Sequence, residues 1–356
     1  MGSDAPVLQR GTGVSLPMPR LVRRTSTGFC PQAAGGPPAA RRRPGTLSTV
    51  DWRVVIRQAL ERNAGLATRR QLLEHMPALI LDGHVGRRNL VRVFPHVYRL
   101  RGTVASDSLL LRAALLHAGP EAALSHTTAL AVHGHHQLGQ PLHLTVDHGI
   151  RRAGAQGLVV HRRLRFDPES AQCVRRNGLL VTTLARTLID SWPLLPVAER
   201  RPLVLDLTRR GLVTAEQLRE ALAERPNVGG RRLLLQTLDL VDDGCQSELE
   251  AHGVLTVFRH RSLPRSVGQY RVQLPDRVVK LDRAWPEAKL AVELDGARHH
   301  TSPENRQADL ARDRALAAAG WIVLRFTYAD VLRDPAGVRA RVLQVYRMRL
   351  SQLDAG

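Results

Sequence analysis

Hydrophobic and polar positions along the chain change period several times, and each period predicts a type of element. From 52 to 60 the apolar residues recur at helical spacing, which predicts that the ordered chain begins with a helix. Thr68 follows as a candidate N-cap for a short second helix. A third apolar segment, 77–84, precedes the alternating stretch 90–100, which predicts a β-hairpin with its turn at Pro95-His96. Helix, helix, helix and hairpin is the order of a winged helix-turn-helix domain, expected over 50–104.

The middle of the chain alternates between helical and strand-like runs. Helices are predicted over 109–117, 122–132, 202–208 and 215–224, and strands over 142–146 and 158–161. Histidines are frequent here, but no cysteine or acid recurs beside them at a fixed spacing, so ordinary histidines are favoured over a metal site. Gly229-Gly230-Arg231 is typical of a linker. Residues 105–243 are therefore interpreted as an α+β connecting or dimerising domain.

The last part of the chain, 244–356, has the pattern of an α/β sandwich with a mixed sheet. The expected elements are a helix opening at Ser247, strands over 267–274, around Asp282 and over 289–295, a helix over 304–319 ended by Gly320, a strand over 321–326 and a helix over 336–350.

Acidic residues are expected to converge on this sheet. A tight turn around Trp285-Pro286-Glu287 would fold the strand of Asp282 onto the strand 289–295, so that Asp282 approaches Glu293. With a period of two, Glu293 and Asp295 point to the same face. Three acids on one patch repel each other unless a cation lies among them, and oxygen ligands favour magnesium, manganese or calcium. The pattern therefore suggests phosphodiester chemistry.

Composition points in the same direction. The chain has 356 residues, enough for two or three domains, and a formal net charge of +20, which indicates a polyanionic partner. Lys280 and Lys289 are its only lysines. A GC-rich genome would equally explain the preference for arginine, but not the excess of positive over negative charge. The three cysteines show no CxxC spacing, so neither a disulfide framework nor a zinc finger is indicated, and a reducing cytoplasm fits.

Residues 1–48 are rich in Gly, Pro, Ser, Thr and Arg. They lack the apolar stretch of a signal peptide, and the chain contains no run long enough to span a bilayer. Two interpretations stand side by side, a disordered basic tail and a start codon placed too far upstream.

The first half of the chain resembles the N-terminal domain of AbiEi-type antitoxins, the DNA-binding half of type IV toxin–antitoxin systems. The resemblance covers roughly 52–240 and rests on the segments 66–72, 91–93, 97–100, 124–130 and 181–190. It implies DNA as a partner, and a toxin-like protein as a possible second one. The segment 77–84 departs from a recognition helix because it is short, mostly apolar and carries Asp82. Phosphate contacts are instead expected from Arg87, Arg88, Arg92 and Arg99. A wing-like protein-interaction module without DNA binding remains the alternative.

The C-terminal part resembles the DUF559 family, the Vsr-like branch of the PD-(D/E)XK nuclease superfamily, from about Ser247 to Leu343. The matching residues are Ser247-Glu248-Leu249-Glu250, Leu281-Asp282, Trp285-Pro286-Glu287, Val292-Glu293-Leu294-Asp295-Gly296, His299-His300, Arg306, Asp309, Arg312-Asp313, Leu316, Gly320-Trp321 and Val323-Leu324-Arg325-Phe326.

This resemblance implies a restriction-endonuclease-like α/β/α fold and roles for particular residues. Asp282 and Glu293, joined by Asp295, would bind Mg²⁺ or Mn²⁺, and Glu250 would approach from the first helix. A capping box, in which Ser247 and Glu250 cap the N-terminus of that helix, explains Glu250 equally well.

The superfamily pattern puts a lysine two residues after the second acid, and this chain has Asp295 there. His299 or His300 would then transfer the proton, and Lys280 or Lys289 would supply the missing cation. Arg306, Asp309 and Asp313 share one helical face, where an ion-pair network supporting the sheet is favoured over direct phosphate contact by Arg306.

The sequence thus predicts a multi-domain α/β protein of the bacterial cytoplasm. The expected activity is metal-dependent DNA cleavage, with an N-terminal domain that recruits or regulates. The alternative is a non-catalytic, antitoxin-like repressor with a degenerate nuclease fold.

Overall fold

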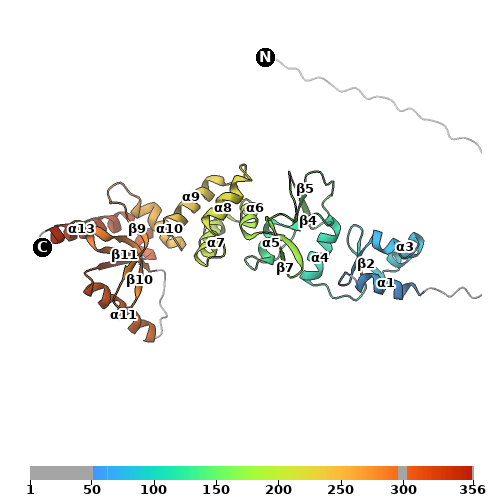
Figure 1. Ribbon diagram of the computed structural model, residues 1–356, viewed down its shortest axis with the longest axis horizontal. Coiled ribbons are helices and arrows are strands. Elements are labelled where there is room, and N and C mark those ends of the chain that lie inside the picture. Colours follow the sequence, from blue (N-terminus) through green and yellow to red (C-terminus); the bar gives the residue numbers. More distant parts are fainter. Residues whose placement is uncertain (1–50, 62, 296–302, 355–356) are drawn as a thin grey trace, which may run out of the picture. The chain divides into compact units, whose positions relative to one another are not determined.

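The protein is described by a computed structural model that covers residues 51–61, 63–295 and 303–354 (Figure 1). The tail expected over 1–48 lies outside the described residues. Within them the fold is mixed α/β, with thirteen α-helices and sheets of three, five and four strands.

The first region contains three helices and a small antiparallel sheet. Its elements are α1 (Trp52–Glu61), β1 (Leu66–Thr68), α2 (Arg69–Leu73), α3 (Ala78–Gly86), β2 (Leu90–Phe94) and β3 (Val97–Leu100), with sheet order β1-β3-β2. Thr68 caps α2 as expected, because its side chain accepts a hydrogen bond from the Gln71 backbone while the Gln71 side chain binds the Thr68 backbone. The predicted hairpin forms, with His96 at a φ of 62° in its turn. Strand β1, only three residues long, was not predicted.

The middle region is built on a five-stranded sheet of order β6-β5-β4-β8-β7. The chain passes through α4 (Asp107–Ala118), β4 (Ala122–Leu124), α5 (His126–Val132), β5 (Leu142–Asp147), β6 (Leu158–Arg163), β7 (Cys173–Arg176) and β8 (Leu179–Thr182). The prediction of one helix over 122–132 is wrong at its start. Ala122, Ala123 and Leu124 pair with β5 and are almost fully buried at the centre of the sheet. An apolar run this short does not distinguish a buried strand from a helix.

Four helices complete this region: α6 (Leu184–Ser191), α7 (Val197–Arg209), α8 (Ala215–Ala223) and α9 (Arg231–Asp242). Thr214 caps α8 with Gln217, as expected. The stretch interpreted as a linker is a tight turn instead, in which Gly230 has a φ of 77° and precedes α9. Leu234 and Leu238 of α9 are buried in the same core as Trp192, so the chain continues without a break in packing.

The C-terminal region matches the predicted order of elements. It contains α10 (Glu248–Gly253), a π-helical turn η1 (Val254–Phe258), β9 (Val267–Gln273), β10 (Val278–Trp285), a 3₁₀ turn η2 (Pro286–Ala288), β11 (Leu290–Asp295), α11 (Pro303–Ala318), β12 (Ile322–Thr327), α12 (Tyr328–Arg333) and α13 (Pro335–Asp354). The sheet order is β12-β11-β10-β9; β11 runs parallel to β12 and antiparallel to β10, so the sheet is mixed as expected.

Helices pack against both faces of this sheet (Figure 1). On one face Leu290 and Val292 share a core with α10 and α13, and on the other Ala291 shares a core with Leu316 of α11. This alternation confirms the expected period of two along β11. Gly320 has a φ of 80° just beyond α11, which is the conformation that a helix-ending glycine adopts. No helix in the described ranges is both long and apolar enough to cross a membrane.

Candidate active site

The β10–β11 hairpin brings Asp282 and Glu293 together. Arg283 pairs with Val292 and Ala284 with Ala291 in the antiparallel ladder, so Asp282 comes next beside Glu293. At this point the ladder changes, because the Leu294 backbone N–H donates to Asp282 Oδ2 at 3.0 Å. The side chain of Asp282 therefore takes the place of a strand carbonyl, which fixes its carboxylate at the edge of the pairing.

Glu250 approaches this carboxylate from α10. The Gln246 backbone N–H donates to Glu250 Oε2 at 3.0 Å and the Ser247 hydroxyl to Oε1 at 2.8 Å. The Ser247 oxygen in turn accepts from the Glu250 N–H, so Glu250 does contribute to the cap of the helix. The expected capping role and the expected position beside Asp282 are therefore both met by one side chain.

Gln269 of β9 lies between the two acids. Its amide nitrogen is 3.3 Å from Glu250 Oε2 and 3.5 Å from Asp282 Oδ1. Its backbone has a φ of 47°, an uncommon conformation for a residue other than glycine. Sequence reasoning did not single out Gln269. Its position two residues after Val267 on a strand paired with β10 was a signal, since that register places it directly opposite Asp282.

Burial and mutual repulsion raise the pKa of both acids. For Asp282 the main cause is desolvation, with a further contribution from the charge of Glu293, while the hydrogen bond from Leu294 lowers the pKa in part. For Glu250 desolvation again comes first, and the charge of Asp282 adds to it. In the part of the chain that the structure describes, no arginine or lysine forms an ion pair with either of them. Two carboxylates are thus held close together at a cost in free energy.

Glu293 has a different environment. Arg312 of α11 binds both of its carboxylate oxygens, at 2.9 Å for the Nη1–Oε2 contact, and also donates to the Lys280 carbonyl at 3.0 Å. Arg325 of β12 lies 3.4 Å from Glu293 Oε2 and holds Asp313 at 2.6 Å. An ion-pair network does support the sheet, as expected for Asp313, but its arginines are Arg312 and Arg325. The parallel register that pairs Glu293 with Arg325 was the signal for the second contact.

Of the other predicted site residues, Lys289 lies apart from these acids. Lys289 lies in the hairpin turn, exposed, with its Nζ 3.1 Å from the Ala319 carbonyl; four residues of strand, about 13 Å, separate it from Glu293. It does not replace the missing lysine. Lys280 and Asp309 are exposed. Asp295 ends β11, but its side chain, that of Arg306, and His299 and His300 lie outside the described residues.

The donor set suits a hard cation in its chemistry but is incomplete in the described ranges. Within 51–61, 63–295 and 303–354, no group of three or more His, Cys, Asp or Glu side chains is arranged to hold a metal ion. Asp282 and Glu250 provide two carboxylates whose repulsion a cation would relieve. Both oxygens of Glu293 are occupied by Arg312.

The N-terminal arginines differ in their availability. Arg87, Arg88 and Arg92 are exposed. Arg99 is half-buried, and its guanidinium donates to the carbonyls of Thr103 at 2.8 Å and Leu100 at 3.3 Å. Arg99 therefore stabilises the end of β3.

Comparisons with known proteins point to the same C-terminal region. Residues 264–345 match the model of a restriction-endonuclease-like family, REase_MTES_1575. The chain is 29% identical over 269 residues to an uncharacterized protein of Mycobacterium tuberculosis, Rv2248, covering 74% of this chain and 94% of that protein. An uncharacterized protein of Haemophilus influenzae is 37% identical over 60 residues, which is 17% of this chain and 46% of its own length.

One solved structure shows a weak likeness. The crystal structure of the RV2827C protein from Mycobacterium tuberculosis aligns with 63% of this chain and 89% of its own, at 15% identity and a TM-score of 0.42.

Proposed function

We propose that the C-terminal region is a metal-dependent endonuclease that hydrolyses phosphodiester bonds in DNA. The observation that carries the proposal is the pair of half-buried carboxylates, Glu250 and Asp282, which lack a cationic partner among the described residues and have raised pKa values. Acids kept in such a state are typical of functional sites. The match of 264–345 to a restriction-endonuclease-like family supports the assignment, since it includes Asp282 and Glu293.

Mg²⁺ or Mn²⁺ would be held by Asp282 and Glu250, with Asp295 and Glu293 as further ligands. When bound, such an ion lowers the pKa of a water molecule and neutralises charge that develops on the scissile phosphate. The chain's own contribution is to orient the ligands. The Leu294 N–H fixes one oxygen of Asp282, the Gln246 N–H fixes one oxygen of Glu250, and the Gln269 amide spans the two.

Arg312 and Arg325 would have a second role in this function. Two guanidinium groups next to the site can bind the phosphates of a DNA strand, which also accept bidentate hydrogen bonds. Transfer of Arg312 from Glu293 to a phosphate would free the Glu293 carboxylate. His299 or His300 is proposed as the proton-transfer group, since imidazole titrates near neutral pH.

The first region would recruit or regulate this activity. We interpret its three helices and hairpin as an AbiEi-like winged helix-turn-helix, and the C-terminal sheet with its helices as an α/β/α sandwich of the PD-(D/E)XK type. Exposed Arg87, Arg88 and Arg92 are the candidate phosphate contacts of the first region.

A second candidate function is a non-catalytic DNA-binding repressor. The ion pairs of Glu293 favour it, because a carboxylate bound by Arg312 at both oxygens is a poor metal ligand. In this function the arginines would have replaced the metal ion, and the fold would retain binding alone.

Cleavage of supercoiled plasmid by the full-length protein tests the proposal. With Mg²⁺ or Mn²⁺ we expect nicked or linear products, and EDTA should abolish them. Asp282→Ala should reduce the rate by roughly a hundredfold or more. Asp276→Asn is the matched control, since this exposed carboxylate on the β9–β10 turn pairs with its neighbour Arg277.

The result separates the two candidate functions. The repressor function predicts two results. The wild type cleaves neither plasmid nor mismatched nor single-stranded DNA, and it binds one DNA sequence selectively, with an affinity that Asp282→Ala leaves unchanged. Equal cleavage by wild type and Asp282→Ala would refute the assignment of the site.

A further inference from the structure

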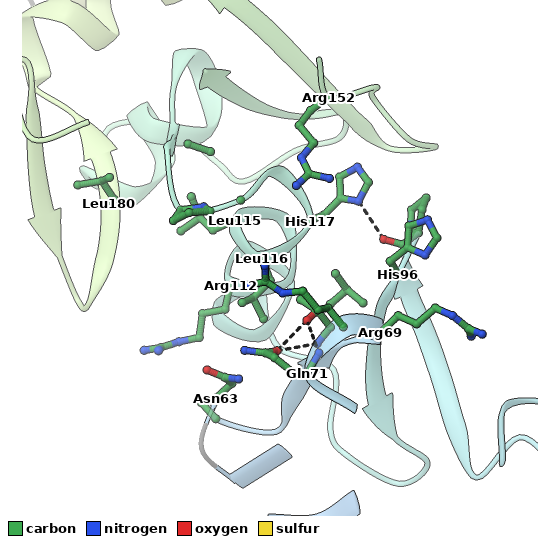
Figure 2. A pocket seen from close by; sticks show the side chains of 18 of the residues that line it. Asn63, Arg69, Gln71, His96, Arg112, Leu115, Leu116, His117, Arg152 and Leu180 are labelled. Atoms are coloured by element: carbon green, nitrogen blue, oxygen red, sulfur yellow. Dashed lines mark hydrogen bonds between the residues drawn. The ribbon is translucent and has the colours of Figure 1, made fainter. Parts of the chain in front are cut away.

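A basic cavity lies in the first half of the chain, far in sequence from Glu250 and Asp282. A cavity of about 1110 Å³ is bounded by α2, the β2–β3 turn, α4 and the β7–β8 hairpin (Figure 2). Its lining residues include five arginines and two histidines, and among the described residues no aspartate or glutamate lines it. The arginines are Arg69, Arg70, Arg112, Arg152 and Arg175.

Three of these arginines have no acidic partner. Arg69 is paired with Asp82 at 2.6 Å, and Arg175 lies 3.9 Å from Glu169. Among the described residues no acid forms an ion pair with any of the other three, Arg70, Arg112 and Arg152. The C-terminal end of α4 adds only about half a negative charge nearby, which three guanidinium groups outweigh. The cavity therefore carries positive charge that its own walls do not neutralise.

The walls of the cavity are held in place. Phe94 and Val97 of the first sheet share one hydrophobic core with Leu111 of α4. His117 lies between two carbonyl oxygens, 3.0 Å from that of Pro95 and 3.2 Å from that of Ala153, and so connects the β2–β3 turn to the loop before β6. Figure 2 shows Arg152 beside this histidine. Such a site does not have to be assembled by its ligand.

The lining also provides apolar surface next to the charges. Leu115 and Leu116 of α4 and Leu180 of β8 line the same cavity (Figure 2). Small-molecule pockets occupy roughly 300–1,000 Å³ and combine apolar walls with a few polar groups. The volume here suits a ligand of nucleotide size.

We propose that this cavity binds the phosphate groups of a nucleotide, either free or within a single-stranded stretch of nucleic acid. Arg70, Arg112 and Arg152 contact the phosphates, because guanidinium groups form charge-assisted, bidentate hydrogen bonds to them. The base packs against Leu115 and Leu116. This site is separate from the C-terminal acids and does not depend on their activity.

Binding assays on the full-length protein in EDTA, where metal-dependent cleavage cannot occur, test the proposal. ATP is titrated by calorimetry and a fluorescein-labelled hexathymidylate by anisotropy, with adenosine as the ligand that lacks phosphate. We expect binding of one or both phosphate-bearing probes that weakens as salt is raised. The triple variant Arg70→Gln, Arg112→Gln, Arg152→Gln should bind roughly tenfold less tightly or worse.

The triple variant Arg53→Gln, Arg57→Gln, Arg101→Gln is the matched control. It makes the same change in net charge at exposed arginines of the first region that do not line the cavity, and it should retain the affinity. If the cavity variant loses its near-UV circular dichroism, the double variant Arg70→Gln, Arg152→Gln replaces it, since both side chains are exposed. Binding of ATP alone identifies a free nucleotide, and binding of the oligonucleotide alone identifies a strand. Absence of binding to both, equal loss in the control, or equal affinity for adenosine would overturn the proposal.

Discussion

Two carboxylates, the buried Asp190 in the middle region and the half-buried Asp282 in the C-terminal sheet, meet opposite electrostatic environments. Arg186 donates to both oxygens of Asp190, at 2.7 and 2.9 Å, and each side chain is only 4% exposed. Burial alone would raise the pKa of Asp190, but the hydrogen bonds and charge of Arg186 outweigh it and lower the pKa. Asp282 is likewise desolvated, but among the described residues its carboxylate accepts from the Leu294 N–H and the Gln269 amide rather than from an arginine, and its pKa is raised.

The difference distinguishes a structural acid from a candidate functional one. An acid paired with arginine stabilises the fold in its ionised form, and nothing is gained by adding a cation. An acid buried next to other acids costs free energy unless a further group, such as a metal ion, binds there. Of the two, therefore, only Asp282 is expected to respond to a cation.

The largest effect should come from breaking the paired site. Arg186→Met leaves the buried Asp190 with Arg225 as its one remaining ion-pair partner among the described residues, and should lower the free energy of unfolding by about 3–5 kcal/mol. Urea denaturation followed by circular dichroism measures it. Arg219→Met is the control, because it removes an arginine from a solvent-exposed ion pair with Asp242 and should cost at most about 1 kcal/mol. Similar losses in both variants would mean that burial does not distinguish the pairs.

A pH-dependent effect of intermediate size should come from three stacked histidines, two of which lie close enough to Asp190 to be affected by its charge. The rings of His126 and His161 stack at 3.7 Å, and His143 Nδ1 lies 2.9 Å from His161 Nε2. Burial lowers the pKa of His126 to about 2 and that of His161 to about 4, with the facing charge of Arg225 lowering both and that of Asp190 opposing it.

Because the folded-state pKa values lie below the ordinary 6.5, the stabilising effect is complete above pH 6.5 and is lost as the pH falls towards 4. We predict a loss of roughly 1 kcal/mol per pH unit in this window, measured by urea unfolding at several pH values. His161→Gln should flatten the dependence. An unchanged slope in that variant would exclude the histidines as its source.

The smallest effect should come from neutralising the unpaired acid. The folded-state pKa of Asp282 is raised, so its contribution to stability falls as pH rises through that pKa. Asp282→Asn should therefore raise the midpoint of thermal unfolding at neutral pH, by roughly 2–4 °C. Asp190→Asn should lower it. Destabilisation by both substitutions would remove the contrast between the two carboxylates.

Local signals in the sequence predicted much of the C-terminal region. The turn at Trp285-Pro286-Glu287 and the position of Gly320 depend on local backbone chemistry, so they were readable from a few neighbouring residues. The strand Ala122–Leu124 was not, because three apolar residues before a helix acquire their conformation from pairing with β5. Strands β7 and β8 were missed as well, although they form a tight hairpin with Asn177-Gly178 at its turn, which is a local signal.

In the candidate site too, local geometry was predictable and long-range contacts were not. The proximity of Asp282 and Glu293 follows from hairpin geometry and was predicted. The occupation of Glu293 by Arg312 depends on how α11 packs across the sheet, which no residue spacing reveals. The contact of Gln269 with both Glu250 and Asp282 likewise requires β9, β10 and α10 to be placed together.

Calorimetric titration of Mn²⁺ into the full-length protein, with Asp282→Asn alongside, tests most directly whether the unpaired acids form a metal site. We predict one ion per chain for the wild type and at least roughly tenfold weaker binding for the variant. The affinity of the wild type should decrease as the pH is lowered towards the raised pKa values of Asp282 and Glu250, because protonated carboxyl groups do not bind the ion. No binding to the wild type, or equal binding to both proteins, would contradict the assignment of these carboxylates as metal ligands.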